Sequence, residues 1–172
     1  RWKFRLGLFD DPYVDPDRAE RVVGSERSSD LALHAARETI TLLRNDGNLL
    51  PLDLARLKTI AVIGPNASRS LLGGYSGVPP HDVTVLDGIK ARVGDAAEIL
   101  YSEGCKITIG GSWTEDTVTP SDPEQDRRQI AEAVKVASRA DVIVLAIGGN
   151  EQTSREAWSR WLRVELYDVP VH

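Results

Sequence analysis

Two carboxylates, Glu151 and Glu156, lie on a polar loop toward the C-terminal end of the sequence. Hydrogen-bonding groups and an aromatic ring accompany them, and from these we predict as substrate-binding residues Asn150, Gln152, Arg155 and Trp158. Sugars present hydroxyl edges and C–H faces, which polar groups beside a tryptophan suit, and a carboxylic acid can protonate a glycosidic oxygen. The same residues also suit a solvated surface loop, and composition alone does not separate the two interpretations.

The loop follows the apolar run at residues 141–147, which is rich in β-branched residues and ends at Gly148 and Gly149. A run of this kind predicts a strand with both faces buried in a parallel sheet. In open α/β sheets, ligands bind at loops that leave the carboxyl ends of strands. The position of the loop therefore favours a functional site there.

The remaining elements must place this strand in a sheet. Similar apolar runs predict strands at 58–64 and 97–101, and a β-rich run occupies 39–43. Residues 28–30 offer an N-cap, and residues 84–87 and 121–124 fit capping boxes. With the apolar periodicity, these signals predict helices at 31–38, 84–93 and 123–140. Alternation of helices with fully apolar strands predicts an α/β fold, a three-layer α/β/α sandwich with a mostly parallel sheet.

The totals exclude several classes of protein. The 172 residues carry a net charge of −5 with 41% hydrophobic and 27% charged residues, which is typical of a globular domain. No Lys/Arg block is present, which argues against a nucleic-acid partner. No apolar stretch approaches the ~18 residues of a membrane span, so we expect no membrane partner.

No cofactor or metal is predicted. Residues 64–74 follow a strand but lack both the GxGxxG and the GKS/GKT spacing, so a structural turn is favoured over a nucleotide site. The histidines are scattered at His34, His81 and His172. Cys105 is the single cysteine, which excludes a disulfide within the chain and a cysteine metal site.

The sequence begins at Arg1 and contains no methionine, so we expect a piece of a longer protein, and its compartment stays open among bacterial cytoplasm, periplasm and secretion. Residues 1–23 are predicted to be the end of a helix followed by a linker. Residues 24–158 form the predicted α/β domain. Residues 159–172 show neither a clear helical period nor a glycine turn, and form an atypical tail.

Four segments together resemble the C-terminal half of a family 3 glycoside hydrolase, the β-glucosidase and β-xylosidase group. They are residues 7–13 (GLFDDPY), 38–52 (ETITLLRNDGNLLPL), 60–67 (IAVIGPNA) and 73–77 (GGYSG). The resemblance implies that residues 1–23 are the end of an N-terminal TIM-like barrel and the interdomain connector. It also implies that the α/β domain is incomplete here.

The resemblance further implies a retaining β-glycosidase that hydrolyses terminal non-reducing β-D-glucosyl or β-D-xylosyl residues. The barrel, as partner, would supply an aspartate nucleophile, and the α/β domain would lend the acid/base from a loop. Residues 154–157 (SREA) are similar to the family's SGEG-like motif, which makes Glu156 the acid/base and Glu151 the reserve choice. Because the nucleophile belongs to the barrel, we expect this chain alone to be inactive.

Two departures from the family pattern stand out. Arg155 and Ala157 replace the commoner glycines of the motif, and residues 159–172 lack the family's Asp-Arg pair and Leu-rich segment. Truncation or a shifted reading frame near Ser159 would explain the tail. The alternative function is a non-catalytic α/β module that binds a ligand or a protein. An upstream barrel with a buried aspartate at its carboxyl face would favour the glycosidase over the binding module.

Overall fold

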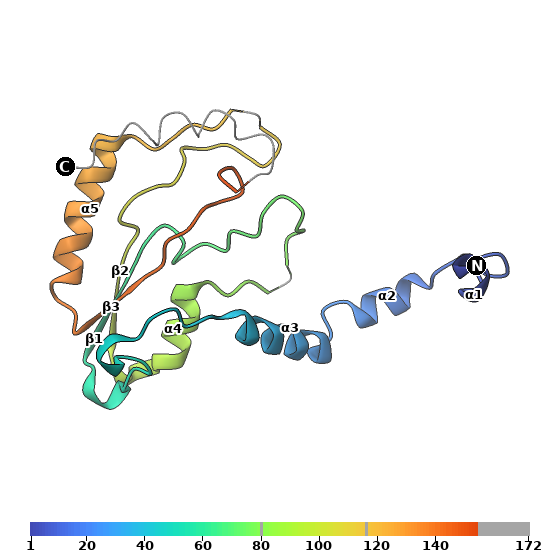
Figure 1. Ribbon diagram of the computed structural model, residues 1–172, viewed down its shortest axis with the longest axis horizontal. Helices are drawn as coiled ribbons and strands as arrows, with labels where there is room; N and C mark the ends of the chain where they lie inside the picture. Colours follow the sequence, from blue (N-terminus) through green and yellow to red (C-terminus); the bar gives the residue numbers. More distant parts are fainter. Residues whose placement is uncertain (80, 116, 155–172) are drawn as a thin grey trace. The chain divides into compact units, whose positions relative to one another are not determined.

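The structure is a computed structural model of the chain, and it describes residues 1–79, 81–115 and 117–154 (Figure 1). The chain divides into two compact units, Arg1–Pro51 and Leu52–His172. Within the described residues, no helix has the length and apolar character needed to cross a bilayer. The tail predicted at 159–172 lies outside the described residues.

The first unit is helical. It contains α1 (Trp2–Arg5), α2 (Pro16–Val22), α3 (Glu26–Thr39) and a short 3-10 turn, η1 (Asp46–Asn48). The predicted end of a helix before Gly7 is confirmed, and Gly7 has a φ of 67°. The predicted linker contains α2, because Asp15 caps it by accepting a hydrogen bond from Asp17 N and Pro16 suits the first helical position.

One helix of this unit is confirmed with an earlier start, and one predicted strand was wrong. The helix predicted at 31–38 begins earlier, at Glu26, because the Ser25 side chain accepts a hydrogen bond from Ser28 N and caps it. The β-rich run predicted at 39–43 forms no strand. Thr39 closes α3, where its hydroxyl donates to Ala36 O at 2.7 Å. No strand of this unit pairs with the β-branched residues that follow, and their propensity alone does not make a strand.

The second unit is built on a parallel sheet. Its elements are η2 (Leu54–Arg56), β1 (Thr59–Ile63), α4 (Val85–Val93), η3 (Gly94–Ala96), β2 (Glu98–Ser102), α5 (Pro123–Ala137) and β3 (Val142–Leu145). The strands lie in the order β2-β1-β3, and both pairs are parallel. The three strands predicted at 58–64, 97–101 and 141–147 are therefore confirmed. Their carboxyl ends face the same edge, from which the chain continues into long loops (Figure 1).

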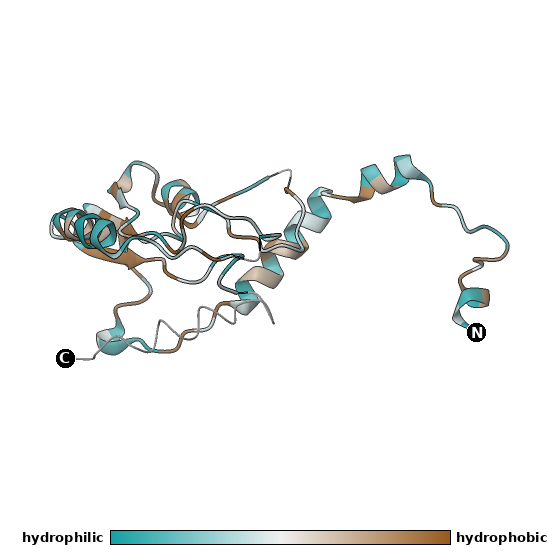
Figure 2. Cartoon of the chain, turned by 90° about the horizontal axis from the view of Figure 1, so that it is seen from above, coloured by the Kyte–Doolittle hydropathy of each residue, from teal (hydrophilic) through white to brown (hydrophobic). Residues whose placement is uncertain are grey.

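The side chains of β1 divide the core into two layers. Ile60 and Val62 pack with Leu86 and Val93 of α4 on one face. Ala61 and Ile63 pack with Ala133 of α5 on the other. Because successive side chains of a strand point to opposite faces, the two helices cover opposite sides of the sheet. This is the predicted three-layer α/β/α arrangement, and Figure 2 shows α5 mostly teal, as expected for a helix with a polar outer side.

β3 differs from its prediction. It was expected to be buried on both faces, but Ile143 is 51% exposed and Leu145 is 59% exposed. β3 is an edge strand of the described sheet, and an apolar hollow of about 270 Å³ lies beside it, lined also by Ile130 and Val134 of α5. In the described part of the chain, only the other face of β3, with Val142 and Val144, packs against the core.

Helix capping fixes where α4 and α5 begin. The predicted capping box of α4 is confirmed, since the Thr84 side chain accepts from Asp87 N and the Asp87 carboxylate accepts from Thr84 N. The capping box predicted for α5 is wrong. Asp122 is the cap instead, because its carboxylate accepts from Glu124 N at 3.0 Å, while the Ser121 hydroxyl donates to Asp126.

Asp141 fastens the start of β3 to the start of β1. Its carboxylate Oδ2 accepts hydrogen bonds from Lys58 N at 2.7 Å and from Thr59 N at 2.9 Å. These two bonds lower the pKa of Asp141 below its ordinary value of 3.8, because they favour the ionised form.

We therefore expect Asp141→Asn to lower the free energy of unfolding at pH 7. The carboxylate's contribution is present above the unfolded-state pKa and is lost as the pH falls through the lowered folded-state pKa. The difference between the two proteins should thus shrink as the pH falls below about 4. Urea unfolding of both proteins across this range measures it, with Asp95→Asn as the exposed control. A difference that does not depend on pH would contradict the prediction.

Candidate functional site

The loop that follows β3 begins against the turn that follows β1. Ala146 N donates to Ile63 O at 2.7 Å, and Asn66 N donates to Ala146 O at 3.3 Å. The Asn66 side chain reaches further along the loop, where its Nδ2 donates to Gly149 O at 3.0 Å. Gly64 has a φ of 127° and lies so close that a Cβ there would be 2.0 Å from Ala146 O. The base of the loop is thus held at the carboxyl edge of the sheet.

The loop then closes into a turn organised by Asn150. The side-chain Oδ1 of Asn150 accepts from Gln152 N and from Thr153 N, both at 3.0 Å. The Thr153 hydroxyl oxygen accepts from Asn150 N at 2.8 Å, and Ser154 N donates to Asn150 O at 3.0 Å. An asparagine that binds its own backbone two residues on is the usual device for such a turn. The turn ends at Ser154, the last residue that the structure describes, two positions before Glu156 in the sequence.

Two side chains of this turn join it to the loop that follows β2. Asn150 Nδ2 donates to Thr108 Oγ1 at 2.7 Å. Gln152 is 1% exposed, and its Nε2 lies 3.5 Å from Ser112 O. Gly111 makes room for it, since a Cβ there would be 1.9 Å from Gln152 Nε2. The loops after β1, β2 and β3 therefore meet at one edge, although they are far apart in the sequence.

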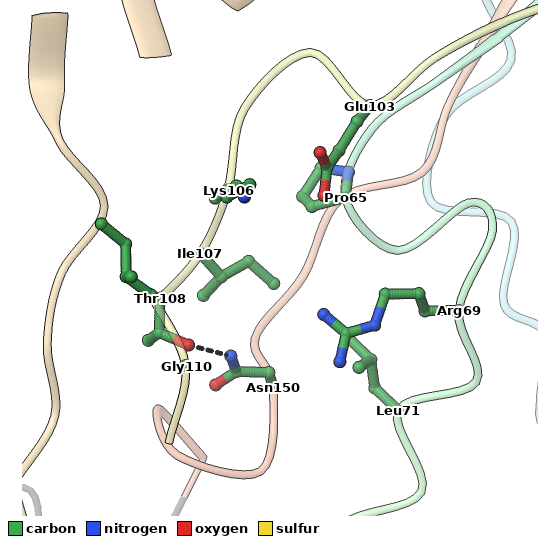
Figure 3. Close-up of a pocket in the computed structure, with 10 residues that line it drawn as sticks. Pro65, Arg69, Leu71, Glu103, Lys106, Ile107, Thr108, Gly110 and Asn150 are labelled. Carbon is green, nitrogen blue, oxygen red and sulfur yellow. Dashed lines mark hydrogen bonds between the residues drawn. The ribbon is translucent and has the colours of Figure 1, made fainter. Parts of the chain in front are cut away.

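A polar pocket of about 230 Å³ lies among these loops (Figure 3). Its polar lining comprises Arg69, Glu103, Lys106, Thr108 and Asn150. Figure 3 shows the Arg69 guanidinium pointing toward the segment that carries Asn150. Within the described residues, neither Arg69 nor Lys106 has an ion-pair partner. The pocket therefore offers charged and neutral hydrogen-bonding groups to a hydroxyl-rich or anionic ligand.

An aromatic pair lies on the loops that follow β1 and β2. The rings of Tyr75 and Trp113 meet edge to face, with their centroids 4.7 Å apart. Gly74 permits this approach, because a Cβ at that position would overlap the Trp113 ring. Tyr75 is 88% exposed and so presents a free ring face of the kind that packs on the C–H face of a sugar. Neither residue was predicted to belong to the site. The signal in the sequence was a single aromatic residue within a glycine-rich stretch for Tyr75 and within a polar stretch for Trp113.

Cys105 follows β2 beside this edge and is half-buried. Burial raises the pKa of its thiol above the ordinary value, and the nearby carboxylates of Asp126 and Glu103 raise it further. The thiol is therefore protonated at neutral pH, which disfavours a nucleophilic role. In the described part of the chain, no three His, Cys, Asp or Glu side chains lie together as a metal would require.

The predicted site residues are only partly covered by the structure. Glu156, Arg155 and Trp158 lie outside the described residues. Glu151 is half-buried on the turn between Asn150 and Gln152. Asn150 directs most of its polar groups to the protein itself, whereas the buried Gln152 Oε1 has no hydrogen-bond partner among the described residues. Contact of either residue with substrate stays a prediction. Thr108 and Ser112, which bind them, were missed because partners about 40 residues away have no local signal.

Comparison with known proteins identifies the family of this chain. A family model described as the Glycosyl hydrolase family 3 C-terminal domain matches residues 40–168. A β-xylosidase of Formosa agariphila is 37% identical over 97% of this chain. A periplasmic β-glucosidase of Salmonella typhimurium is 36% identical over 92% of it. The chain spans only 22% of the length of each.

Comparison with solved structures supports the same family. A β-glucosidase from Erythrobacter marinus superposes with a TM-score of 0.82 and 42% identity, covering 92% of this chain and 22% of that one. A β-glucosidase from Listeria innocua in complex with glucose gives a TM-score of 0.62 and 30% identity, covering 91% of this chain and 19% of that one. The chain therefore belongs to glycoside hydrolase family 3 and carries its C-terminal domain.

Proposed function

We propose that this chain supplies the acid/base loop of a retaining β-glycosidase that acts on terminal β-D-glucosyl or β-D-xylosyl residues. The observation that carries the proposal is the location of the turn at 150–154. The loops after β1 and β2 hold it at the carboxyl edge of a parallel sheet, and only residue 155 separates it from Glu156 in the sequence. The names of the β-xylosidase and β-glucosidase relatives support the choice of substrate class.

The proposed reaction has two steps. Glu156, as a carboxylic acid, protonates the glycosidic oxygen while a carboxylate of the N-terminal barrel attacks the anomeric carbon, and the aglycone leaves as an alcohol. Glu156, now a carboxylate, then takes a proton from the water that breaks the glycosyl-enzyme ester. The sugar leaves with its β configuration retained, and the starting protonation states are restored.

The surrounding residues have proposed roles as well. Arg155 and Trp158 follow the turn and are proposed to contact the sugar, together with Asn150 and Gln152. Glu151 is the second choice for the acid/base, since it lies on the turn itself. The proposed partner is a TIM-like barrel, with residues 1–23 as the end of that barrel and the connector. The short coverage of the relatives supports a protein with further domains.

Aryl glycosides test this function. We expect the complete protein, with its barrel, to hydrolyse 4-nitrophenyl β-D-glucoside or β-D-xyloside, and NMR to detect the β anomer of the free sugar first. The 172-residue chain alone should release no nitrophenol above the buffer rate, because it lacks the nucleophile. First formation of the α anomer would contradict retention. Equal activity of the isolated chain would place the whole reaction in this domain and contradict the two-domain proposal.

A further inference from the structure

The Asn150 amide is occupied by the protein on both of its sides. Its oxygen accepts from two backbone N–H groups and from the Thr153 hydroxyl at 3.2 Å. Its nitrogen donates to Thr108 Oγ1 at 2.7 Å, across 42 positions of sequence. An amide has two lone pairs and two N–H donors, so a single N–H remains for any ligand. These contacts make Asn150 the junction between its own turn and the neighbouring loop.

The junction lies where it can restrict the proposed proton donor. Ser154 is the last residue bonded to the turn, through its N–H to Asn150 O. Glu156 follows Ser154 by only two residues in the sequence, and two residues of extended chain span at most about 7 Å. Six residues, counted from Asn150 with no turn, would allow about 20 Å. Fixing the turn therefore shortens the chain between a fixed backbone and the proposed donor from six residues to two.

The tie to Thr108 sets where the fastened turn lies. The bonds within residues 150–154 define the shape of the turn, whereas Asn150 to Thr108 and Asn66 to Gly149 join it to other loops. Gln152, buried against Gly111, adds packing at the same place. Proton transfer is sensitive to such placement, because a displacement of about 1 Å can cost on the order of 10²-fold in rate.

We propose that Asn150 and Thr108 are positioning residues. Their hydrogen bond fixes the turn at 150–154, which precedes the proposed proton donor in the sequence, against the loop after β2. This inference rests on the proposed function, in which the following residues carry the acid/base. It assigns to Asn150 a positioning role in addition to the proposed sugar contact, for which its second amide N–H remains. Thr108, which no sequence pattern marks, becomes part of the machinery of the reaction.

Thr108→Val removes the acceptor and keeps the shape of the side chain. Acid assistance matters most for a poor leaving group, so we compare phenyl and 2,4-dinitrophenyl β-glycosides in the complete protein. For the phenyl substrate we expect kcat to fall about 10-fold, because the donor is displaced. For the dinitrophenyl substrate kcat/KM, which reports formation of the glycosyl-enzyme, should stay within about twofold, whereas kcat should fall because the same group is the base of the second step. KM for the phenyl substrate should be unchanged. Thr108→Ser, which retains the hydroxyl, should restore the phenyl rate.

The matched control is Thr119→Val, an exposed threonine on the same loop with no side-chain hydrogen bond among the described residues. It should leave both rates unchanged. A raised KM with unchanged kcat in Thr108→Val would show that the junction serves binding and would overturn the inference. So would an equal fall of kcat/KM on both substrates, or no change of kcat/KM on either. Thermal unfolding of each variant shows whether a loss of activity comes from misfolding. In that case the rates of Thr108→Ser decide whether the hydroxyl at this position is what the reaction needs.

Glu156→Gln, measured with the same two substrates, separates this inference from the proposed function. If Glu156→Gln loses the phenyl rate selectively but Thr108→Val does not, the positioning role fails and the acid/base assignment stands. If Thr108→Val is selective and Glu156→Gln is not, the loop positions a different donor, with Glu151 the first to test. If neither is selective, both ideas are wrong.

Discussion

Glu156→Gln in the complete protein should lose most of its activity on poor leaving groups. General acid–base catalysis contributes about 10² to 10⁴ in rate, so kcat/KM for a phenyl β-glycoside should fall by that amount. The amide of glutamine cannot deliver a proton to the departing oxygen. An acidic phenol needs little protonation, so formation of the glycosyl-enzyme from a dinitrophenyl glycoside should be nearly unchanged, and a burst of the phenol should precede slow turnover.

Glu151→Gln is the matched control for this prediction. Glu151 lies on the same loop, carries the same functional group and is the alternative assignment. If Glu156 is the acid/base, Glu151→Gln should change kcat/KM for the phenyl substrate by less than about 10-fold. The reverse order of the two effects would move the acid/base to Glu151. Equal and small effects would show that neither carboxylate transfers the proton.

Gly64→Ala should cause the largest loss of stability among single methyl additions in the loops around the site. Gly64 has a φ of 127°, a region that side chains with a Cβ rarely adopt, and the added Cβ would meet Ala146 O at 2.0 Å. Backbone strain and overpacking each cost about 1–3 kcal/mol, so their sum is about 2–6 kcal/mol, and we expect a loss of about 3 kcal/mol. For a domain of this size, the melting temperature should fall by roughly 6–12 °C.

The same substitution should also affect the proposed site, because Ala146 begins the loop that carries Asn150 and precedes Glu156 in the sequence. Ala146 O is backbone and cannot rotate away, so relief of the overlap requires β3 or the turn after β1 to move. Gly77→Ala is the control, since its Cβ would meet no atom within 4 Å. Calorimetry of both variants measures the difference. A melting temperature of Gly64→Ala equal to that of Gly77→Ala would contradict the close packing of β1 against the start of the loop.

The sequence predicted the sheet well, for a local reason. Each strand is a short β-branched run that ends at a glycine or a polar turn, and such runs have few alternatives in a small α/β domain. The cap of α4 was equally predictable, because Thr84 and Asp87 are three residues apart and bond to each other. Parallel strands share one carboxyl edge, so the location of the polar loop at that edge also followed from the pattern.

Features that depend on distant neighbours could not be predicted. The exposure of Ile143 and Leu145 depends on what lies beside an edge strand, which the run itself does not reveal. Residues 39–43 have strand-forming types, but a strand exists only where a partner pairs with it. The role of Asn150 depends on Thr108, 42 residues away, and both belong to irregular loops. Residue type alone marked Asn150 as a group that could bind a sugar, whereas the geometry identifies its protein partners.

Azide rescue of Glu156→Ala tests the central claim most directly. In a retaining enzyme without its base, water attacks the glycosyl-enzyme slowly, but azide is a nucleophile that needs no base. With a dinitrophenyl β-glycoside, we predict that azide raises the turnover of this variant at least about 10-fold and gives a β-glycosyl azide. Absence of that product from Glu156→Ala, with its formation by Glu151→Ala, would contradict the assignment of the proton donor to Glu156.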